Sequence, residues 1–226
     1  LEAVLSGPLS GERVVLVGHS FGSFVVRAYA SRRPADVAGL VLVDPAVEWL
    51  TPDPHRAYRL RRARRLARVG AWLAHVGVPG VLLGLLFRGA PSAPRRFSRL
   101  FGETVAQTLG RLVGEVRKLP PDTYPLMRAF WSQPKCYRAM ADHLSMLERD
   151  GAVIARIAPA PGIPTIVISS GNQSSEYIEA QRALAEASHA GRHVIAARSS
   201  HWVQLDEPAL VIAAVEELGR RVWRPA

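Results

Sequence analysis

The segment Gly18-His19-Ser20-Phe21-Gly22 has the residue types and spacing of a turn that carries a nucleophilic serine. A run of apolar residues, Val14–Val17, precedes it, and a helix-forming stretch follows it. A sharp turn from strand to helix would hold Ser20 in a strained backbone conformation, with its hydroxyl exposed above the end of a sheet. Gly18 and Gly22 are expected to leave room for neighbouring atoms that a Cβ would meet. The segment therefore predicts a serine that attacks a carbonyl carbon.

The same turn predicts how negative charge would be stabilised beside the serine. The N-terminus of the following helix would point at the reacting atoms and favour developing negative charge there. The backbone N–H of Phe21 would then be one donor of an oxyanion hole. His19 lies inside the turn, where we expect a structural role.

Strand-like and helix-like patterns alternate around this turn and again near the C-terminus. They predict strands over residues 12–18, 39–44, 164–170 and 193–197, and helices over 22–33, 175–188 and 207–223. The apolar runs inside the first two strands are typical of strands buried on both faces of a parallel sheet. A strand, a helix and a second strand at this spacing form a right-handed crossover unit. We therefore expect an α/β fold whose sheet is mostly parallel and flanked by helices.

Residues 48–150 differ from the two ends of the chain. They show helical periodicities broken by glycine and proline, without strand-like runs. We interpret them as an inserted region of several short helices. The chain then has three parts: residues 1–47 with the serine turn, the helical insertion 48–150, and residues 151–226, which complete the α/β core.

The segments at both ends resemble the α/β-hydrolase superfamily in its Gly-His-Ser-x-Gly form. The resemblance extends from the serine turn through Gly39-Leu40-Val41-Leu42-Val43-Asp44-Pro45, and it resumes at Ser200-His201-Trp202 and Asp206-Glu207-Pro208. It implies that residues 48–150 form the cap of that family. It also implies about four earlier strands, which this sequence lacks, together with a second oxyanion donor. We therefore expect a fragment of a longer enzyme that folds poorly or is inactive alone.

The resemblance assigns the general base to His201. In that family, a histidine in the loop after the last strand accepts the serine proton and later donates it to the leaving group. Near neutral pH an ordinary imidazole suits both steps. The family usually has glycine before this histidine, where this chain has Ser200.

Two residues compete for the role of the acid that orients His201. Most of the family carries the acid in the loop after the penultimate strand, but residues 169–175 contain no Asp, and Glu176 comes late, where a helix is expected to begin. A minority takes the acid from the end of the strand after the nucleophile helix, which is the place of Asp44. We favour Asp44 and keep Glu176 as the alternative, since both preserve the chain order of serine, acid and histidine.

Together these residues predict a serine hydrolase that cleaves an ester, lactone or similar acyl bond through an acyl-enzyme. This chemistry requires no metal ion and no organic cofactor. The apolar side chains of the cap, among them Trp72 and the leucines between residues 82 and 86, favour a hydrophobic small-molecule substrate. The alternative is a non-catalytic α/β-hydrolase-like binding protein or an inactive fragment, because the usual acid is absent and Ser200 departs from the family pattern.

The chain is strongly basic, with a formal net charge of +10, and many of its arginines lie between Arg56 and Arg68. Such a run attracts anionic partners, but no nucleic-acid-binding motif accompanies it, so we exclude nucleic acid as a partner. Residues 69–87 are apolar, and glycine and proline break them too often for a straight membrane-spanning helix. Residues 56–87 therefore form either short cap helices over a hydrophobic pocket or a peripheral contact with an anionic membrane. We expect a cytoplasmic chain.

Overall fold

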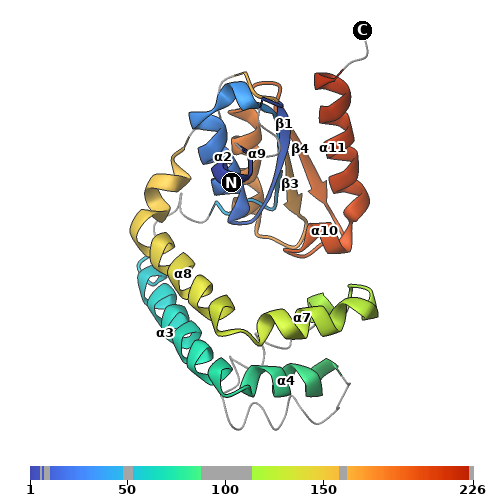
Figure 1. Cartoon of the computed structure of the whole chain (residues 1–226). Helices are drawn as coiled ribbons and strands as arrows, with labels where there is room; N and C mark the ends of the chain where they lie inside the picture. The colour runs from blue at the N-terminus through green and yellow to red at the C-terminus, as the bar shows by residue number, and fades with distance from the viewer. Residues whose placement is uncertain (6, 8–10, 48–52, 88–113, 158–161, 224–226) are drawn as a thin grey trace. The chain divides into compact units, whose positions relative to one another are not determined.

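The computed structural model describes residues 1–5, 7, 11–47, 53–87, 114–157 and 162–223 (Figure 1). The chain divides into two compact units. The first, here named the α/β unit, comprises Leu1–Pro52 and Gly151–Ala226. The second, the helical unit, comprises Asp53–Asp150.

A four-stranded parallel sheet forms the centre of the α/β unit. Its strands are adjacent in chain order: β1 (Val14–His19), β2 (Val37–Val43), β3 (Thr165–Ser170) and β4 (Arg192–Ala196). Each strand lies within two residues of its predicted bounds. Because all four strands run in the same direction, the loops that follow them meet at one edge of the sheet. The predicted α/β fold with a parallel sheet is confirmed.

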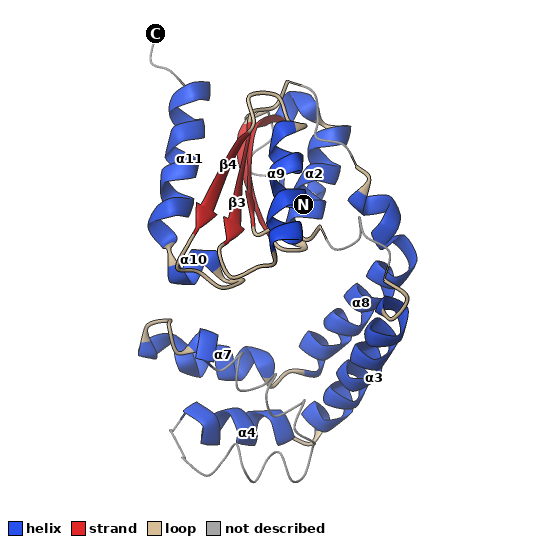
Figure 2. Ribbon diagram, turned by 180° about the vertical axis from the view of Figure 1, so that it is seen from behind, coloured by secondary structure: helices blue, strands red, loops and turns tan. Residues whose placement is uncertain are grey.

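Helices cover both faces of this sheet (Figures 1 and 2). β2 is buried along its whole length, and its side chains alternate between the two faces. Leu40 and Leu42 pack on the side of α2 (Gly22–Arg32) and α9 (Ser175–Glu186). Val41 and Val43 pack on the other side, against α11 (Pro208–Val222). A strand covered on both faces has no solvent-facing position, which explains why its sequence is a continuous apolar run.

β1 departs from the expectation of burial on both faces. Among the described residues it pairs with β2 alone, and Val17 is 46% exposed. The apolar run of residues 14–17 thus predicts the strand correctly but not its burial. A strand with a neighbour on one side only is less completely covered than the central β2.

Shorter elements complete the α/β unit. These are α1 (Glu2–Leu5), the 3-10 turn η1 (Pro34–Asp36) and α10 (Val203–Asp206). The final helix predicted over residues 207–223 is confirmed as α11, within one residue at each end, and a separate short helix, α10, precedes it. The chain bends between the two helices at Glu207, which has non-helical backbone angles (φ −135°, ψ 61°).

The helical unit contains helices and no strand among its described residues. Its elements are α3 (Arg56–His75), α4 (Val78–Phe87), η3 (Pro121–Thr123), α7 (Tyr124–Trp131) and α8, which begins here and runs over Pro134–Ala155. The start of α3 and the end of α8 are tied by Arg61 and Arg64, which both lie 3.2 Å from carboxylate oxygens of Glu148. No described helix is by itself long and apolar enough to cross a membrane; α3 and the first part of α4 reach that length and composition only as a pair bent by 93°.

Candidate active site

Ser20 lies at the junction between β1 and α2. Its φ is 51°, in the left-handed region that few residues other than glycine adopt. The neighbouring chain holds this conformation, because the Ser20 N–H donates to the Val43 carbonyl at 2.9 Å and the Ser20 carbonyl accepts from the Ser23 hydroxyl at 2.6 Å. The predicted strained turn from strand to helix is therefore present, and strain of this kind is concentrated at functional sites.

The two glycines of this turn have different roles. A Cβ on Gly18 would lie 2.7 Å from both the Gly22 carbonyl oxygen and Val26 Cγ2, so no side chain fits at this position. A Cβ on Gly22 would meet no atom of the described residues within 4 Å. The expectation that both glycines relieve crowding is thus right for Gly18 and wrong for Gly22, whose backbone is itself the neighbour that Gly18 must accommodate.

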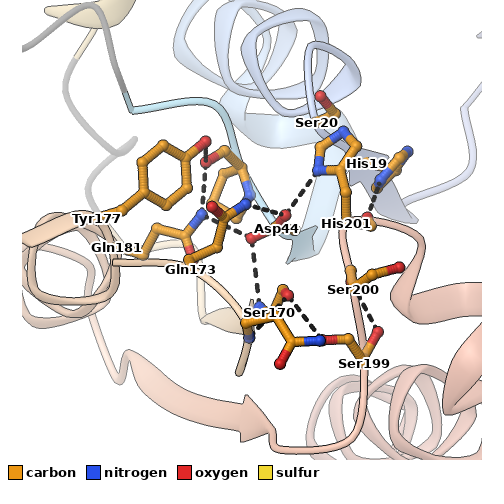
Figure 3. Close-up of polar contacts among 12 residues, drawn as sticks. His19, Ser20, Asp44, Ser170, Gln173, Tyr177, Gln181, Ser199, Ser200 and His201 are labelled. Carbon is orange, nitrogen blue, oxygen red and sulfur yellow. Dashed lines mark hydrogen bonds and ion pairs between the residues drawn. The ribbon is translucent and has the colours of Figure 1, made fainter. Parts of the chain in front are cut away.

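Asp44 follows β2 and is fully buried. It is a second residue with positive φ, at 39°, and its N–H donates to the Ile168 carbonyl of β3 at 2.7 Å. One carboxylate oxygen lies 2.6 Å from His201 Nδ1 and also accepts from Gln173 Nε2 at 3.1 Å. The other accepts from Gln181 Nε2 at 3.1 Å and from the Ser170 N–H at 3.3 Å. These four donors surround the carboxylate (Figure 3).

The donors determine the protonation of Asp44. Burial alone would raise the pKa of this carboxyl, but the hydrogen bonds from His201, Gln181, Gln173 and the Ser170 N–H outweigh burial and lower its pKa below the ordinary value. Asp44 is therefore an anion at neutral pH. It can hold the His201 ring in the tautomer that carries a proton on Nδ1 and can stabilise a positive charge on that ring.

His201 lies in the loop after β4, with its side chain 41% exposed. Its Nδ1 faces Asp44, and Ser20 lies on the opposite side of the ring (Figure 3). The imidazole of His19 donates from Nε2 to the His201 carbonyl at 2.7 Å, and the two ring centroids are 4.6 Å apart. Burial lowers the pKa of His19, which keeps its ring neutral. The predicted structural residue of the turn thus supports the backbone of the predicted base.

Of the two acids considered, the structure brings Asp44 to His201. Glu176 is exposed in the first turn of α9, where Ser174 caps the helix by accepting from the Tyr177 N–H. A carboxylate there interacts favourably with the helix N-terminus, which accounts for its position. Ser20, Asp44 and His201 come from the carboxyl ends of β1, β2 and β4, so the loop after β4 crosses the end of β3 to reach Asp44.

Ser200 and its neighbours hold the loop that carries His201. The Asp206 carboxylate accepts from the Ser200 N–H and the Ser200 hydroxyl, both at 2.9 Å, and from the Ser199 hydroxyl at 3.3 Å. The Asp206 side chain thus fixes this loop. Ser200, which stands where the family usually has glycine, therefore helps to hold the loop, because its hydroxyl donates a hydrogen bond that glycine cannot make.

Sequence reasoning missed Gln173 and Gln181 as partners of Asp44. Gln181 is fully buried on α9 and also donates to the Pro45 carbonyl at 2.7 Å. A usable signal was present: Gln181 lies four residues after Tyr177 and four before the buried Ala185, so it occupies the inward face of an amphipathic helix. A polar residue at such a position requires a buried partner.

Phe21 opens α2 with helical backbone angles (φ −58°, ψ −33°), so its N–H belongs to the N-terminal end of that helix. Its ring packs edge-on against Phe24, at 5.9 Å between centroids. Within the described part of the chain, no group of three or more His, Cys, Asp or Glu side chains is placed to hold a metal ion. The groups that are placed for chemistry are a hydroxyl, an imidazole and a carboxylate.

Comparison with known proteins shows what the chain is similar to. A model of the Alpha/beta hydrolase family matches residues 1–214. The Abhydrolase domain-containing protein lid-1 of Caenorhabditis elegans is 28% identical over 111 residues, which cover 49% of this chain and 24% of that protein. The chain thus spans about a quarter of the length of this curated relative.

Two solved structures share the fold. A thermophilic esterase from Thermogutta terrifontis aligns with a TM-score of 0.59 and 18% identity, over 98% of this chain and 70% of the esterase. Est816, described as an N-acyl homoserine lactone degrading enzyme, aligns with a TM-score of 0.53 and 18% identity, over 95% of this chain and 70% of Est816. At these identities the likeness concerns the fold.

Proposed function

Because the chain belongs to the alpha/beta hydrolase family, we propose that it is a serine hydrolase that cleaves an ester, lactone or similar acyl bond of a hydrophobic small molecule. One observation carries the proposal: His201 places Nδ1 2.6 Å from the buried Asp44 carboxylate and presents the other side of its ring to Ser20. A carboxylate, an imidazole and a hydroxyl that follow one another in space in this order are the arrangement used for acyl transfer by serine.

In the first half-reaction the Ser20 hydroxyl oxygen attacks the carbonyl carbon of the substrate. His201 takes the hydroxyl proton on Nε2, and Asp44 stabilises the imidazolium that forms. The negative charge moves to the carbonyl oxygen, which would lie at the N-terminus of α2 and accept from the Phe21 N–H. When the tetrahedral intermediate collapses, the alcohol oxygen leaves with the proton from His201, and the acyl group remains on Ser20.

In the second half-reaction water replaces the alcohol. His201 takes a proton from the water as its oxygen attacks the acyl carbon, and the same N–H stabilises the oxyanion. Collapse returns the proton to Ser20 and releases a carboxylic acid. For a lactone, the two products are joined as one hydroxy acid.

Two observations support the substrate class. The two structures with the same fold are described as an esterase and as an enzyme that degrades a lactone, and both chemistries pass through attack on an acyl carbon. The sequence of α4 contains no charged residue, and this apolar composition of the inserted region favours an apolar substrate.

Covalent labelling with a fluorophosphonate tests the nucleophile. We expect the reagent to label the protein at Ser20, as read by peptide mass spectrometry, and the label to disappear in both Ser20→Ala and His201→Ala. Ser31→Ala is the matched control, because Ser31 is an exposed serine on the same helix. Absence of labelling in the unsubstituted protein, or equal labelling of Ser20→Ala, would favour a binding protein without hydrolase activity.

Hydrolysis of p-nitrophenyl esters of graded chain length tests the substrate class. A hydrophobic pocket predicts that kcat/KM rises with acyl length, by up to about threefold to fourfold for each buried methylene. A flat or falling series would contradict the hydrophobic substrate while leaving the nucleophile assignment intact.

A further inference from the structure

The helix α3 has two faces of different character within the helical unit. Small residues form its packed face: Ala67, Ala71 and Ala74 are buried, and a Cβ on Gly70 would lie 2.6 Å from the ring of Tyr137 on α8. The opposite face is open. Residues four and then three apart along it, from Tyr58 to Val76, point away from the packed face.

The open face carries arginine in its first half and apolar side chains in its second half. Arg62 and Arg65 lie on this face, and Arg68 lies beside it, one residue before Val69. All three are exposed and form no ion pair with any other residue that the structure describes. Trp72 is 68% exposed, Val76 64% and Val69 53%. Residues 56–87 contain neither Asp nor Glu, so α3 and α4 supply no counter-charge of their own. The nearby carboxylates of Asp53 and Glu148 pair with other arginines of α3, namely Arg59, Arg61 and Arg64.

The apolar end of α3 leads directly into a corner. α4 follows after a bend of 93° (Figures 1 and 2). Val81 and Leu85 are exposed on α4. We name the exposed residues on both sides of the bend, Val69, Trp72, Val76, Val81 and Leu85, the apolar corner. Exposed tryptophan and aliphatic side chains beside arginines that pair with no described residue are unusual for a surface that faces only water.

We propose that the α3–α4 corner is a binding surface for anionic phospholipid bilayers. The apolar corner would enter the headgroup and acyl boundary, and Arg62, Arg65 and Arg68 would contact the lipid phosphates. Interfacial helices bury their apolar side chains roughly 5–10 Å into this boundary. Tryptophan is favoured at this depth because its ring is apolar and its N–H is polar.

Charge complementarity selects an anionic bilayer over a neutral one. Each arginine close to an anionic surface strengthens binding severalfold. Peripheral membrane binding requires electrostatic attraction and buried apolar area, and the three exposed arginines and the apolar corner supply the two. A nucleic acid would use the arginines but would leave the apolar corner in water. The combination of exposed arginines in the first half of this face with exposed apolar side chains in its second half therefore favours lipid over nucleic acid.

Flotation with vesicles of phosphatidylcholine, with or without phosphatidylglycerol, tests the surface. We expect the 226-residue chain to float with the anionic vesicles at low salt and to remain in the soluble fraction with the neutral ones. Arg62→Gln/Arg65→Gln/Arg68→Gln should bind at least about tenfold more weakly. The matched control, Arg32→Gln/Arg182→Gln/Arg220→Gln, removes the same charge from exposed arginines of the α/β unit and should float like the unsubstituted chain.

Quenching of tryptophan fluorescence by brominated lipid tests the depth of the apolar corner. We expect quenching in the unsubstituted chain and its loss in Trp72→Phe, which preserves the apolar side chain and flotation. A chain that stays soluble with anionic vesicles at low salt would overturn the proposal. So would equal flotation of the two triple variants, or binding to heparin and to anionic vesicles alike without quenching at Trp72, which would indicate a general polyanion surface.

Discussion

At the scale of single residues, the site depends on a buried carboxylate that stays charged. An unpaired ion in the core would be unstable, so the four donors to Asp44 are a condition for its ionised state. One of those donors is His201 itself. The bond that orients the proposed base therefore also helps the α/β unit to tolerate the charge.

Substitution at the two candidate acids separates their roles. We expect Asp44→Asn to lower kcat for ester hydrolysis by as much as ~10⁴-fold, because an amide cannot hold His201 in the required tautomer or stabilise the imidazolium. Glu176→Gln removes the same charge from an exposed position and should change kcat less than about twofold. Steady-state kinetics on one ester measures both variants. A large loss in Glu176→Gln with little loss in Asp44→Asn would reverse the assignment.

At the scale of elements, several hydrogen bonds hold the loop between β4 and α10. Asp206 accepts from both Ser199 and Ser200, His19 donates to the His201 carbonyl, and the Glu207 carboxylate accepts from the Arg198 N–H at 2.9 Å. These contacts all bind the loop to other parts of the α/β unit. They place the imidazole before any substrate arrives, which reduces the cost of ordering it during reaction.

Removing hydrogen bonds that hold this loop should slow ester hydrolysis without preventing folding. We expect Asp206→Ala to lower kcat by roughly 10- to 100-fold with a smaller change in KM, because the imidazole is displaced and not removed. Ser200→Gly keeps the backbone N–H that donates to Asp206 and should cost less than Asp206→Ala. Fluorophosphonate labelling should remain at Ser20 in both variants, only more slowly. Unchanged kcat in Asp206→Ala would show that the loop holds its position by other means.

At the scale of the whole molecule, the hydrogen bonds to Asp44 connect the site with stability. Its pKa is lowered in the folded state because the donors outweigh burial, so its contribution to the free energy of unfolding is present above the ordinary carboxyl pKa. That contribution is lost as the pH falls through the lowered pKa. A variant that loses one donor should therefore begin to lose stability at a higher pH.

The variant Gln181→Met tests whether the hydrogen bonds to Asp44 determine how stability depends on pH. The substitution retains the volume of the buried side chain and removes its donor to Asp44 and to Pro45, so we expect the free energy of unfolding at pH 7 to fall by about 1–3 kcal/mol. The acid unfolding midpoint should shift to higher pH. Gln173→Met, which removes one donor at a less buried position, should show the same trend to a smaller degree. Urea unfolding at a series of pH values measures both, and an unchanged acid midpoint in Gln181→Met would contradict the role given to this donor.

Much of the α/β unit could be predicted from the sequence, because buried parallel strands leave short apolar runs and the serine turn has a strict glycine requirement at Gly18. The acid could not be decided from the sequence. Asp44 and Glu176 both precede His201 in the chain, and the choice depends on a loop that crosses the end of β3. The apolar run of residues 14–17 also did not by itself predict that Val17 on β1 is exposed, since an apolar run indicates a strand but not how many neighbours the strand has.

The pairing of Arg61 and Arg64 with Glu148 has a consequence for how the sheet forms. β2 and β3 are neighbours, yet residues 44–164 separate them in the chain, and closing so long a loop is entropically costly and slow. Because the first turns of α3 and the last turns of α8 are held together, a helical unit that has already folded brings the two ends of that loop to one place. A helical unit that folds early would therefore shorten the loop that must close before β2 and β3 can pair.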